Sequence, residues 1–378
     1  MLSVDVLIIG GGPAGSSLGY IIQKAGYKCC IVDKAIFPRN KLCGGLLTKK
    51  AHNLIAEIFG DTLFPCERTS KNVSLFLGTQ KLSNIQTDSD FYLISRINFD
   101  YYFIEKYIKA NGILFEGCKV KSLSIDTNHA MLSSGEEIEF TVLIGADGAN
   151  SQVRKCIDVN YRPNAMCLEF DSPSCDVTDE IQVYFSAIRS GYGWCFPKED
   201  RYTVGVGGLI TTNKDIKKSF EAFNKSTGKS AEKAKILGAL IPFGKFVKIP
   251  CKNNIILIGD AAGLVDPITG EGLYFAFLSA KYASEAVIDF FASQRNLSQS
   301  YLPNVRRIQN IIIEANRFKR LFFNEVTKPF FLKMVNGKTH VVKYFCENLL
   351  SHYNLTYFEF ITKYMKARRE RKKAEKNS

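Results

Sequence analysis

Short, strongly apolar runs in the first and middle parts of the chain predict buried strands. The run at residues 5–9 leads through glycines into a helical stretch that we expect to end near Lys24, and a second strand is expected at residues 28–32. Similar runs stand at residues 141–144 and 255–258. Continuous apolar strands are typical of parallel sheets that helices cover on both faces. The pattern therefore predicts an α/β unit with a parallel sheet.

The segment that follows, residues 161–249, has a different pattern. Ile181, Val183 and Phe185 are apolar at every second position, and the sequence GYGWCFPKEDRYTVGVGG predicts two strands joined at residues 198–201. Alternation with period two is typical of half-buried strands, so a mostly antiparallel sheet is expected here. Together the two patterns predict a parallel α/β unit combined with an antiparallel sheet, which is α+β overall.

The C-terminal part, from about Ser298 onward, is predicted to be helical and is rich in aromatic residues. It ends in a basic tail, residues 363–376, with eight basic and two acidic residues. Such a tail is most often solvated, and docking on an anionic membrane surface is the alternative that we keep open. Nucleic acid is not an expected partner, because no aromatic residues for base stacking are interleaved in the last 14 residues.

Length and charge add a broad constraint. With 378 residues, 46% of them hydrophobic, the chain can bury a large core, and its length suggests two or three structural units. The formal net charge of +13, from 50 basic and 37 acidic residues, suggests an anionic partner such as phosphate, a membrane surface or nucleic acid. Net charge by itself does not choose among these.

The eleven cysteines form neither a CxxC pair nor a His/Cys ligand spacing, so we expect no metal site and a reducing, cytoplasmic setting. The chain begins directly with a strand, without the charged and apolar regions of a leader peptide. No run approaches the roughly 18–20 apolar residues of a membrane-spanning helix. Any membrane association is therefore expected to be peripheral.

The first motif with chemical meaning is a glycine pattern between the strand at residues 5–9 and its helix. Gly10, Gly12 and Gly15 have the spacing G-x-G-x-x-G, and Asp33 ends the next strand, 18 residues after Gly15. In this arrangement the glycines let the backbone approach a pyrophosphate at a helix N-terminus, and the acid can accept ribose hydroxyls. A purely structural turn is the alternative, and the pattern does not separate FAD from NAD.

Two later motifs narrow the choice of cofactor. The strand at 141–144 opens into GADGANSQVR, which contains Asp147 and Gly148, and the strand at 255–258 opens into GDAAGLVDPITGEG. In this order and at these separations, the three motifs resemble the para-hydroxybenzoate-hydroxylase-type FAD fold. The segment GDAAGLVDPITGEG in particular is similar to the geranylgeranyl reductase family. This resemblance implies FAD as the cofactor.

The same motifs suggest individual roles around the flavin. Asp260, at a strand end, is placed to hold a ribityl hydroxyl, and Gly270 and Gly272 let a helix N-terminus approach the flavin edge. For Asp260 alone, capping of the following helix is the alternative. The resemblance implies an arginine near the flavin phosphate or ribityl chain, for which Arg96 and Arg39 are candidates. A helix-capping or solvated arginine is the alternative for both.

The expected cofactor contacts are strand-end acids, glycines and neighbouring side chains of these segments. They are Gly10, Gly12, Pro13, Ala14, Gly15, Asp33, Lys34, Arg39, Cys43, Gly44, Gly45, Arg96, Val120, Asp147, Gly148, Gly259, Asp260, Gly270 and Gly272.

The expected division of the chain has three parts. They are a discontinuous FAD-binding Rossmann-like domain of residues 1–60, 95–160 and 250–297, an antiparallel substrate domain of residues 61–94 and 161–249, and a helical C-terminal region of residues 298–378 with the basic tail.

Two short segments are candidates for catalysis. The segment YGWCFP matches the YxWxFP pattern of geranylgeranyl reductases, and we expect Tyr192 and Trp194 to wall a long apolar pocket on the sheet face opposite the flavin. The segment KLCGGLL places Cys43 before two glycines, as the resembled family does, and it is expected to run along the cofactor toward the isoalloxazine. Aromatic core packing and a small buried thiol are the respective alternatives.

Three classes of function are consistent with these motifs. The first is an FAD-dependent reductase of C=C bonds in a polyprenyl lipid, diphosphate or quinone tail. The second is a flavin monooxygenase or halogenase, although halogenases are expected to be much longer and to carry a lysine in a setting that we do not find. The third is a non-catalytic FAD- or prenyl-binding protein. A single glycine fingerprint also implies an external electron donor, either a reduced nicotinamide or a ferredoxin-like protein.

Overall fold

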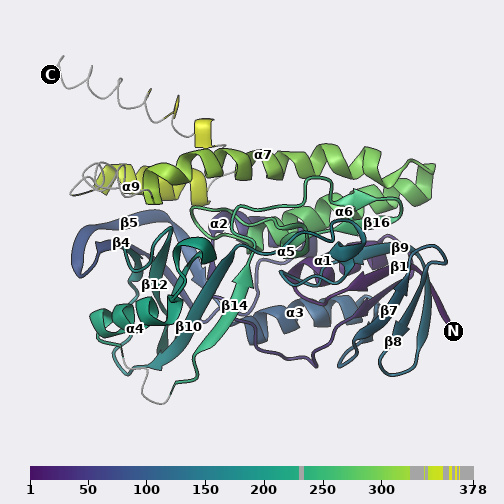
Figure 1. Ribbon diagram of the computed structural model, residues 1–378, viewed down its shortest axis with the longest axis horizontal. Coiled ribbons are helices and arrows are strands. Elements are labelled where there is room, and N and C mark those ends of the chain that lie inside the picture. Colours follow the sequence, from purple (N-terminus) through teal and green to yellow (C-terminus); the bar gives the residue numbers. More distant parts are fainter. Residues whose placement is uncertain are drawn as a thin grey trace.

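The computed structural model describes residues 1–229, 234–323, 336, 339–351, 357–359, 362, 363 and 366. Its strands form two eight-stranded sheets, which we call sheet A and sheet B. Two long helices, α6 (Leu273–Ser293) and α7 (Leu297–Phe323), lie along one side of the molecule, and α7 extends over both sheets (Figure 1). The cofactor motifs lie around sheet A, and the YGWCFP segment lies in sheet B.

Sheet A contains the strands that the apolar runs predict, and its central strands are parallel. Its main order is β15-β16-β9-β1-β2-β6, with β7 and β8 attached to β9 as an antiparallel extension. The strands are β1 (Leu2–Ile9), β2 (Cys29–Val32), β6 (Ile113–Phe115), β7 (Val120–Ser124), β8 (His129–Leu132), β9 (Glu137–Gly145), β15 (Cys251–Lys252) and β16 (Ile255–Leu257). The predicted parallel sheet is confirmed.

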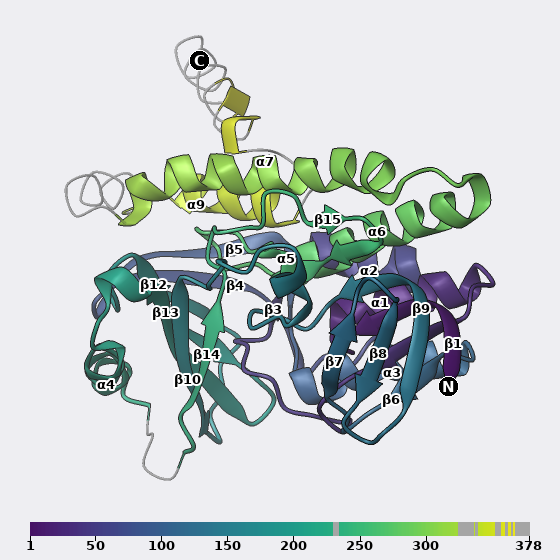
Figure 2. The ribbon, with the colours of Figure 1, turned by 45° about the vertical axis from the view of Figure 1, so that its right-hand side comes forward.

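Helices bury the apolar side chains of sheet A. Residues Val6, Leu7 and Ile8 of β1 are fully buried, and Leu18 and Ile22 of the first helix pack in the same core. The helices that accompany the sheet are α1 (Pro13–Lys24), α2 (Lys49–Phe59) and α3 (Arg96–Lys109), with α6 beside α1 (Figure 2). Truncating one of the buried leucine or isoleucine side chains named above to alanine is expected to lower the free energy of unfolding by about 2–5 kcal/mol.

The turn between β1 and α1 can be made only by glycine at two positions. Gly10 has a φ of +105°, a conformation that side-chain-bearing residues rarely adopt. A Cβ atom on Gly15 would lie 1.9 Å from the carbonyl oxygen of Gly10. By contrast, a Cβ atom on Gly12 would meet only the Arg39 guanidinium, at 3.4 Å. The turn therefore requires glycine at positions 10 and 15. Gly12 is not required by the turn, and the space beside its Cα atom is unfilled except for the Arg39 guanidinium.

Sheet B is mostly antiparallel, as predicted, with one parallel pair between β4 and β11. Its order is β14-β10-β13-β12-β11-β4-β5-β3, and the hairpin between β12 and β13 turns at residues 198–200. The strands are β3 (Leu46–Leu47), β4 (Arg68–Leu77), β5 (Gln80–Leu93), β10 (Ala165–Pro173), β11 (Ile181–Phe185), β12 (Gly191–Pro197), β13 (Arg201–Leu209) and β14 (Leu237–Ile241). The domain bounds stay a prediction, but β3 pairs in sheet B although it lies within residues 1–60.

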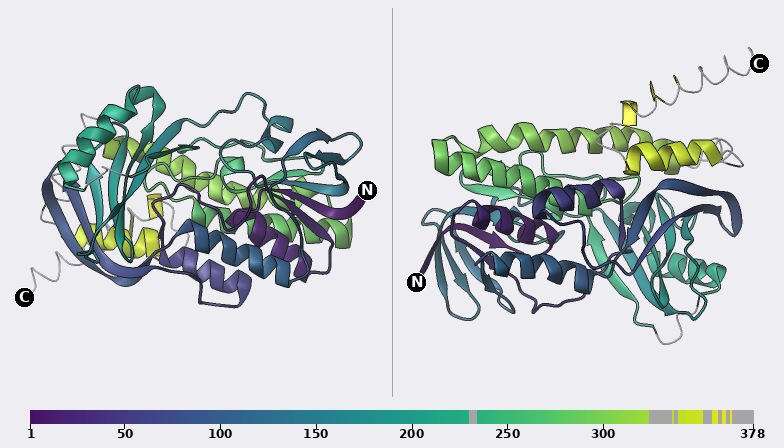
Figure 3. Two further views of the ribbon diagram at one scale, coloured as in Figure 1. Left: turned by 90° about the horizontal axis from the view of Figure 1, so that it is seen from below. Right: turned by 180° about the vertical axis from the view of Figure 1, so that it is seen from behind.

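Each face of sheet B has a different cover. Helix α4 (Ile216–Thr227) buries Phe220 and Phe223 against one face. Near the other face, α9 (Thr339–Phe345) and the π-helix η3 (Cys346–Ser351) that follows it pack on β5 (Figure 3). Most of the basic tail and the segment 328–335 lie outside the described residues. No helix within the described ranges has the length and apolar character that crossing a membrane requires.

The Gly15 contact leads to a test of the fold. Replacing Gly15 with alanine forces the turn to move, because the new methyl group meets backbone rather than a flexible side chain. We expect Gly15→Ala to lower the free energy of unfolding by roughly 2–4 kcal/mol in denaturant titrations. The control is Gly12→Ala, which should stay within about 1 kcal/mol of the wild type. Equal stability of the two variants would contradict this account of the turn.

Candidate active site

One cavity of about 450 Å³ lies between the cofactor motifs of sheet A and the apolar face of sheet B. At one end it is lined by residues of the predicted cofactor site, including Gly12, Ala14, Gly148 and Asp260. At the other end its walls are mostly aliphatic and aromatic side chains of sheet B and the C-terminal helices. The loop of residues 41–45 lines the cavity between these two ends. We refer to them as the cofactor end and the apolar end.

At the cofactor end, the predicted residues come together from segments far apart in the sequence. Pro13, Arg96, Gly270 and Gly272 line the cavity with the four residues named above. The buried Asp33 carboxylate accepts the N–H groups of Gly11, at 2.7 Å, and Ala35, at 2.9 Å, which fixes the carboxylate at the glycine turn. Eight predicted contacts do not line the cavity, and among them Lys34 is exposed and Val120 is buried at the start of β7. The other six are Gly10, Gly15, Asp33, Arg39, Asp147 and Gly259.

Two of the predicted acids, Asp147 and Asp260, have different surroundings. One Asp147 oxygen accepts the N–H groups of Gln152, at 2.6 Å, and Val153, at 3.3 Å, and burial raises the pKa of this carboxyl. Asp260 lies in the first turn of α5 (Gly259–Ala262), and its carboxylate is 3.9 Å from the Lys41 ammonium. The N-cap of α5 is Ile258 and the helix has no side-chain cap, so Asp260 does not have the capping role that was the alternative. Asp260 instead lines the cavity.

The two candidate arginines converge on one carboxylate that sequence reasoning missed. Asp100 is completely buried and receives two hydrogen bonds from Arg96, at 2.6 and 2.8 Å, and an ion pair from Arg39 at 3.1 Å. Although burial opposes the charged form of Arg96, Asp100 and then Cys43 raise its pKa above the ordinary value. Arg96 is 6% exposed, so a solvated arginine is excluded. The spacing of Arg96 and Asp100, four residues apart on a helix, was the available signal.

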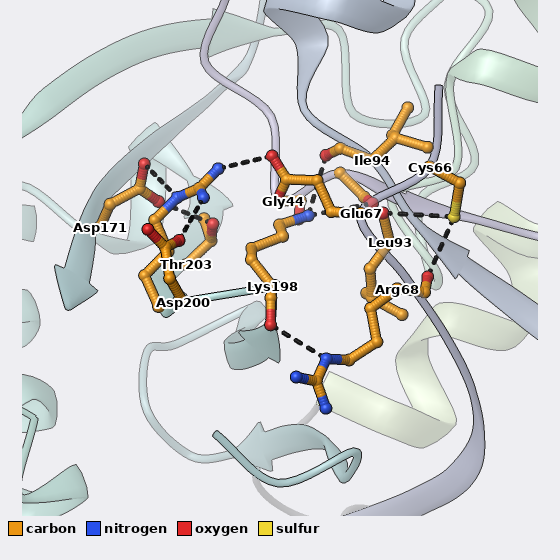
Figure 4. Close-up of polar contacts among 12 residues, drawn as sticks. Gly44, Cys66, Glu67, Arg68, Leu93, Ile94, Asp171, Lys198, Asp200 and Thr203 are labelled. Atoms are coloured by element: carbon orange, nitrogen blue, oxygen red, sulfur yellow. Dashed lines mark hydrogen bonds and ion pairs between the residues drawn. The ribbon is translucent and has the colours of Figure 1, made fainter. Parts of the chain in front are cut away.

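Residues 43–45 are held by two buried charged side chains. Glu169 of β10 accepts the N–H group of Cys43 at 2.8 Å. Lys198, which follows β12, donates to the carbonyl oxygens of Gly44, Gly45 and Ile94 at 2.9, 3.2 and 2.9 Å (Figure 4). Sequence reasoning missed both side chains, because no local pattern connects them to Cys43.

The glycines after Cys43 are required by close contacts. Gly45 has a φ of +69°, and a Cβ atom there would lie 2.2 Å from the carbonyl oxygen of Ile94. A Cβ atom on Gly44 would lie 3.0 Å from the Phe196 ring and 3.1 Å from the Trp194 indole nitrogen. The two glycines therefore let this loop lie directly on the aromatic face of sheet B.

The aromatic residues of β12 wall the cavity. Tyr192, Trp194 and Phe196 alternate along the strand and all line it. The Trp194 ring lies over β13, where a Cβ atom on Gly205 would be 2.4 Å from it. The Tyr192 hydroxyl donates to the carbonyl oxygen of Thr269, next to Gly270. The β12 aromatics therefore connect the apolar end to the loop that carries the third cofactor motif.

Comparison with known proteins agrees with this geometry. Residues 3–50 match a family model described as an FAD binding domain. The chain is 31% identical to an uncharacterised protein of Methanosarcina barkeri over 301 residues, which cover 76% of this chain and 75% of that protein. It is 29% identical to the geranylgeranyl diphosphate reductase of Rhodobacter capsulatus, with 77% of each covered. The menaquinone reductase of Mycobacterium tuberculosis is 27% identical, with 75% of this chain and 76% of that protein covered.

A solved structure has the same fold over nearly the whole length. The geranylgeranyl bacteriochlorophyll reductase-like protein of Thermoplasma acidophilum superposes with a TM-score of 0.78 at 21% identity, covering 96% of both chains. The chain belongs to the geranylgeranyl reductase family of FAD-dependent oxidoreductases. The resemblance in the sequence, the mixed α/β fold and the FAD cofactor are thereby confirmed.

One sequence-based expectation about halogenases was wrong. The flavin-dependent brominase Bmp2 superposes on this reductase-family chain with a TM-score of 0.71 at 19% identity, covering 98% of this chain and all of Bmp2. A halogenase of this fold is therefore not always a much longer chain. At this identity the likeness shows the fold alone, because one fold supports several chemistries.

The residues at the cofactor end of this reductase-family chain fit FAD. The α1 N-terminus has no side-chain cap, so its first N–H groups remain available beside Gly12 and Ala14, which line the cavity. The surface of Gly12 is open, with the Arg39 guanidinium as the nearest group. These features suit a pyrophosphate, and Asp33 at the end of β2 suits a ribose. The individual cofactor contacts stay a prediction.

The open surface of Gly12 gives a test of cofactor binding. A methyl group at this position enters the cavity without disturbing the turn. We expect Gly12→Ala to weaken FAD binding about tenfold or more, measured by titration of flavin fluorescence, because displacement of one good contact costs at least about 1.4 kcal/mol. Apoprotein stability should be nearly unchanged. Unchanged FAD affinity would place the pyrophosphate elsewhere.

The buried Glu169 predicts how stability depends on pH in this enzyme. Burial raises the pKa of Glu169 from 4.5 to about 7, even though the Cys43 N–H group and nearby cations favour the charged form. As the pH rises from 4.5 to about 7, the unfolded chain loses this proton before the folded protein does, so folding loses stability. The quantity to compare is the free energy of unfolding of Glu169→Gln minus that of the wild type. Between pH 4.5 and a pH above 7, this difference should shift in favour of the variant by up to about 3 kcal/mol.

Denaturant titrations of both proteins across this pH range test the effect. A stability difference that does not change with pH would mean that Glu169 titrates as an ordinary carboxyl group. The matched variant Glu180→Gln changes a carboxyl just before β11, whose pKa is lowered from 4.5 by Lys81 and other partners despite burial. This carboxyl titrates at and below pH 4.5, so the stability difference between this variant and the wild type should stay nearly constant between about pH 5 and pH 7.

Proposed function

We propose that this FAD-dependent oxidoreductase reduces C=C bonds of a polyprenyl chain on a lipid, a diphosphate or a quinone tail. The observation that carries the proposal is the continuity of the cavity, in which the cofactor end opens directly into a long apolar compartment. An isoprenoid chain has no polar groups along its length, so recognition must come from apolar walls. The names of the geranylgeranyl diphosphate and menaquinone reductase relatives support the same substrate class.

The apolar end consists of side chains that suit a long hydrocarbon. From sheet B it contains Val73, Leu75, Ile181 and Val183, and from the C-terminal helices it contains Val342, Phe345 and Leu350. Among the described lining residues, the basic ones are Lys41 and Arg96, both beside the cofactor end. A charged head group therefore has no cationic partner among the described residues deep in the apolar end.

The reaction requires a hydride and a proton. Reduced FAD, when bound, supplies a hydride to an electron-poor or protonated carbon, and the protein must provide the proton at the neighbouring carbon. Cys43 lines the cavity between its two ends and lies beside the Arg96 guanidinium. Tyr192 is a poorer acid, because burial raises its pKa and its hydroxyl already donates to Thr269. We assign proton delivery to Cys43 and chain positioning to Tyr192 and Trp194.

Two further parts of the proposal concern partners. Electrons come from an external donor, a reduced nicotinamide or a ferredoxin-like protein, because a single glycine fingerprint is present in the sequence. An apolar substrate would be collected at a membrane surface, to which the basic tail could dock electrostatically. That tail lies mostly outside the described residues.

The decisive experiment uses the FAD-loaded full chain, reduced by light under anaerobic conditions. Adding geranylgeranyl diphosphate or a prenylated quinone should reoxidise the flavin and give products heavier by two hydrogens per reduced bond, measured by mass spectrometry. A monooxygenase, the second function class that the sequence leaves open, would stay reduced with these substrates and turn over only with oxygen. Binding of prenyl chains without turnover by any donor would leave the non-catalytic alternative.

The role of Cys43 has its own test. We expect Cys43→Ala to bind FAD normally but to reduce substrate about 10²-fold more slowly, the usual magnitude for a lost proton donor. The rate of flavin reoxidation by substrate in single turnover measures this step. The control is Cys156→Ala, a partly buried cysteine outside the cavity lining, which should be unaffected. Unchanged turnover of Cys43→Ala would assign the proton to another group.

A further inference from the structure

Two buried, oppositely charged side chains hold the loop of residues 42–45 from the side away from the cavity. Leu42, Cys43, Gly44 and Gly45 line the cavity, whereas Glu169 and Lys198 do not. Glu169 is 6% exposed and Lys198 is 2% exposed. Their contacts with the loop are to backbone atoms, the Cys43 N–H group and the Gly44 and Gly45 carbonyl groups.

This arrangement determines which way the peptide groups face. In a trans peptide the C=O and N–H groups point to opposite sides. Because the Gly44 carbonyl points to Lys198, the N–H group of Gly45 points the other way. Because the Cys43 N–H group points to Glu169, the Leu42 carbonyl also points the other way. Neither Gly45 N–H nor Leu42 C=O has a hydrogen-bond partner among the described residues.

We propose that Glu169 and Lys198 are positioning residues that hold the loop so that the Gly45 N–H and Leu42 C=O groups face the cavity beside the Cys43 thiol. Opposite charges are required, because Glu169 must accept from an N–H group and Lys198 must donate to carbonyl groups. The proposal concerns the loop itself and does not depend on which substrate the enzyme reduces.

The position of the two side chains in sheet B supports a dedicated role. Glu169 follows Cys167 on the cavity face of β10, and Lys198 follows Phe196 on the same face beyond β12. Apolar residues could fill these buried positions. A charged side chain there costs free energy unless it has partners. Lys198 has three carbonyl partners, but one Glu169 oxygen is buried without a hydrogen-bond partner among the described residues. This incomplete pairing disfavours the charged form of Glu169.

Several charged and titratable groups surround Glu169. They are Asp171 and Cys167 on β10, Lys198 beyond β12, Arg96 on α3 and Cys43 on the loop itself. Burial has the largest effect and raises the pKa of Glu169 to about 7, while the Cys43 N–H group, Lys198 and Arg96 oppose this rise. As Glu169 ionises through neutral pH, its bond with the Cys43 N–H group strengthens. Burial also lowers the pKa of Lys198 to about 8. The loop should therefore be held most firmly between about pH 7 and pH 8, where both side chains are charged.

The test measures access to the Cys43 thiol in the FAD-loaded full chain. Alkylation by iodoacetamide is followed by mass spectrometry of the peptide that contains Cys43, with Cys118 and Cys156 as internal references. The variants are Lys198→Met and Glu169→Gln. The matched control is Arg201→Met, in the same hairpin as Lys198. It removes ion pairs with Glu67, Asp171 and Asp200 but no contact with the loop.

We expect Lys198→Met to accelerate alkylation of Cys43 about tenfold at pH 7, the effect of losing charge-assisted hydrogen bonds. Arg201→Met should stay within about twofold of the wild type, and the reference cysteines should not change. The rate ratio of Glu169→Gln to wild type should rise from about one at pH 5.5 to severalfold at pH 7.5, where Glu169 is mostly ionised and Lys198 is still mostly charged. The reason is that only the ionised acid differs strongly from the amide.

Three results would overturn the proposal. They are an unchanged Cys43 rate in Lys198→Met, an equal increase at the reference cysteines, and a Glu169→Gln ratio that does not depend on pH. If Lys198→Met does not fold, the pH dependence of the nearly isosteric Glu169→Gln variant decides the question. Because no readout uses a prenyl substrate, the result is independent of whether the proposed reductase activity is found.

Discussion

Three backbone carbonyl groups, from Gly44, Gly45 and Ile94, converge on the ammonium group of Lys198. A buried ammonium requires acceptors on every side, and here the backbone provides them. The contact joins the end of β12 in sheet B to the loop after the first cofactor motif and to Ile94, which lies between β5 and α3. It therefore ties the apolar face of sheet B to the cofactor end of the cavity.

The shape of the cavity follows from how closely these parts approach one another. The loop can lie on Trp194 and Phe196 only because Gly44 has no side chain, and the Trp194 ring can lie over β13 only because Gly205 has none. The contact surface is consequently made of backbone and aromatic rings, without a polar layer between the two ends. Under the proposed function, a cofactor at one end would lie next to a substrate at the other, which is the condition for transfer of a hydride without water.

The fold alone does not select the chemistry. The brominase Bmp2 and the geranylgeranyl bacteriochlorophyll reductase-like protein have the same architecture as this chain. What can differ is the apolar end, where α9 and η3 cover the pocket face of sheet B and contribute Val342, Phe345 and Leu350 to its walls. Enclosure by aliphatic side chains favours a hydrocarbon over a polar aromatic substrate, because desolvated polar groups would lack partners there.

The sequence by itself determined the parts that depend on local constraints. The strand predicted at residues 5–9, the glycine turn and helix that follow it, and the strand with alternating apolar residues at 181–185 depend on backbone sterics and short-range periodicity, and these elements were predicted correctly. Only the tertiary structure revealed Asp100, Glu169 and Lys198 as partners of the site. Lys198 and Gly44 are 154 residues apart, and a buried charge becomes informative only when the groups that solvate it are known. Local sequence patterns therefore predict helices, strands and turns. Which distant polar groups become partners depends on how these elements pack.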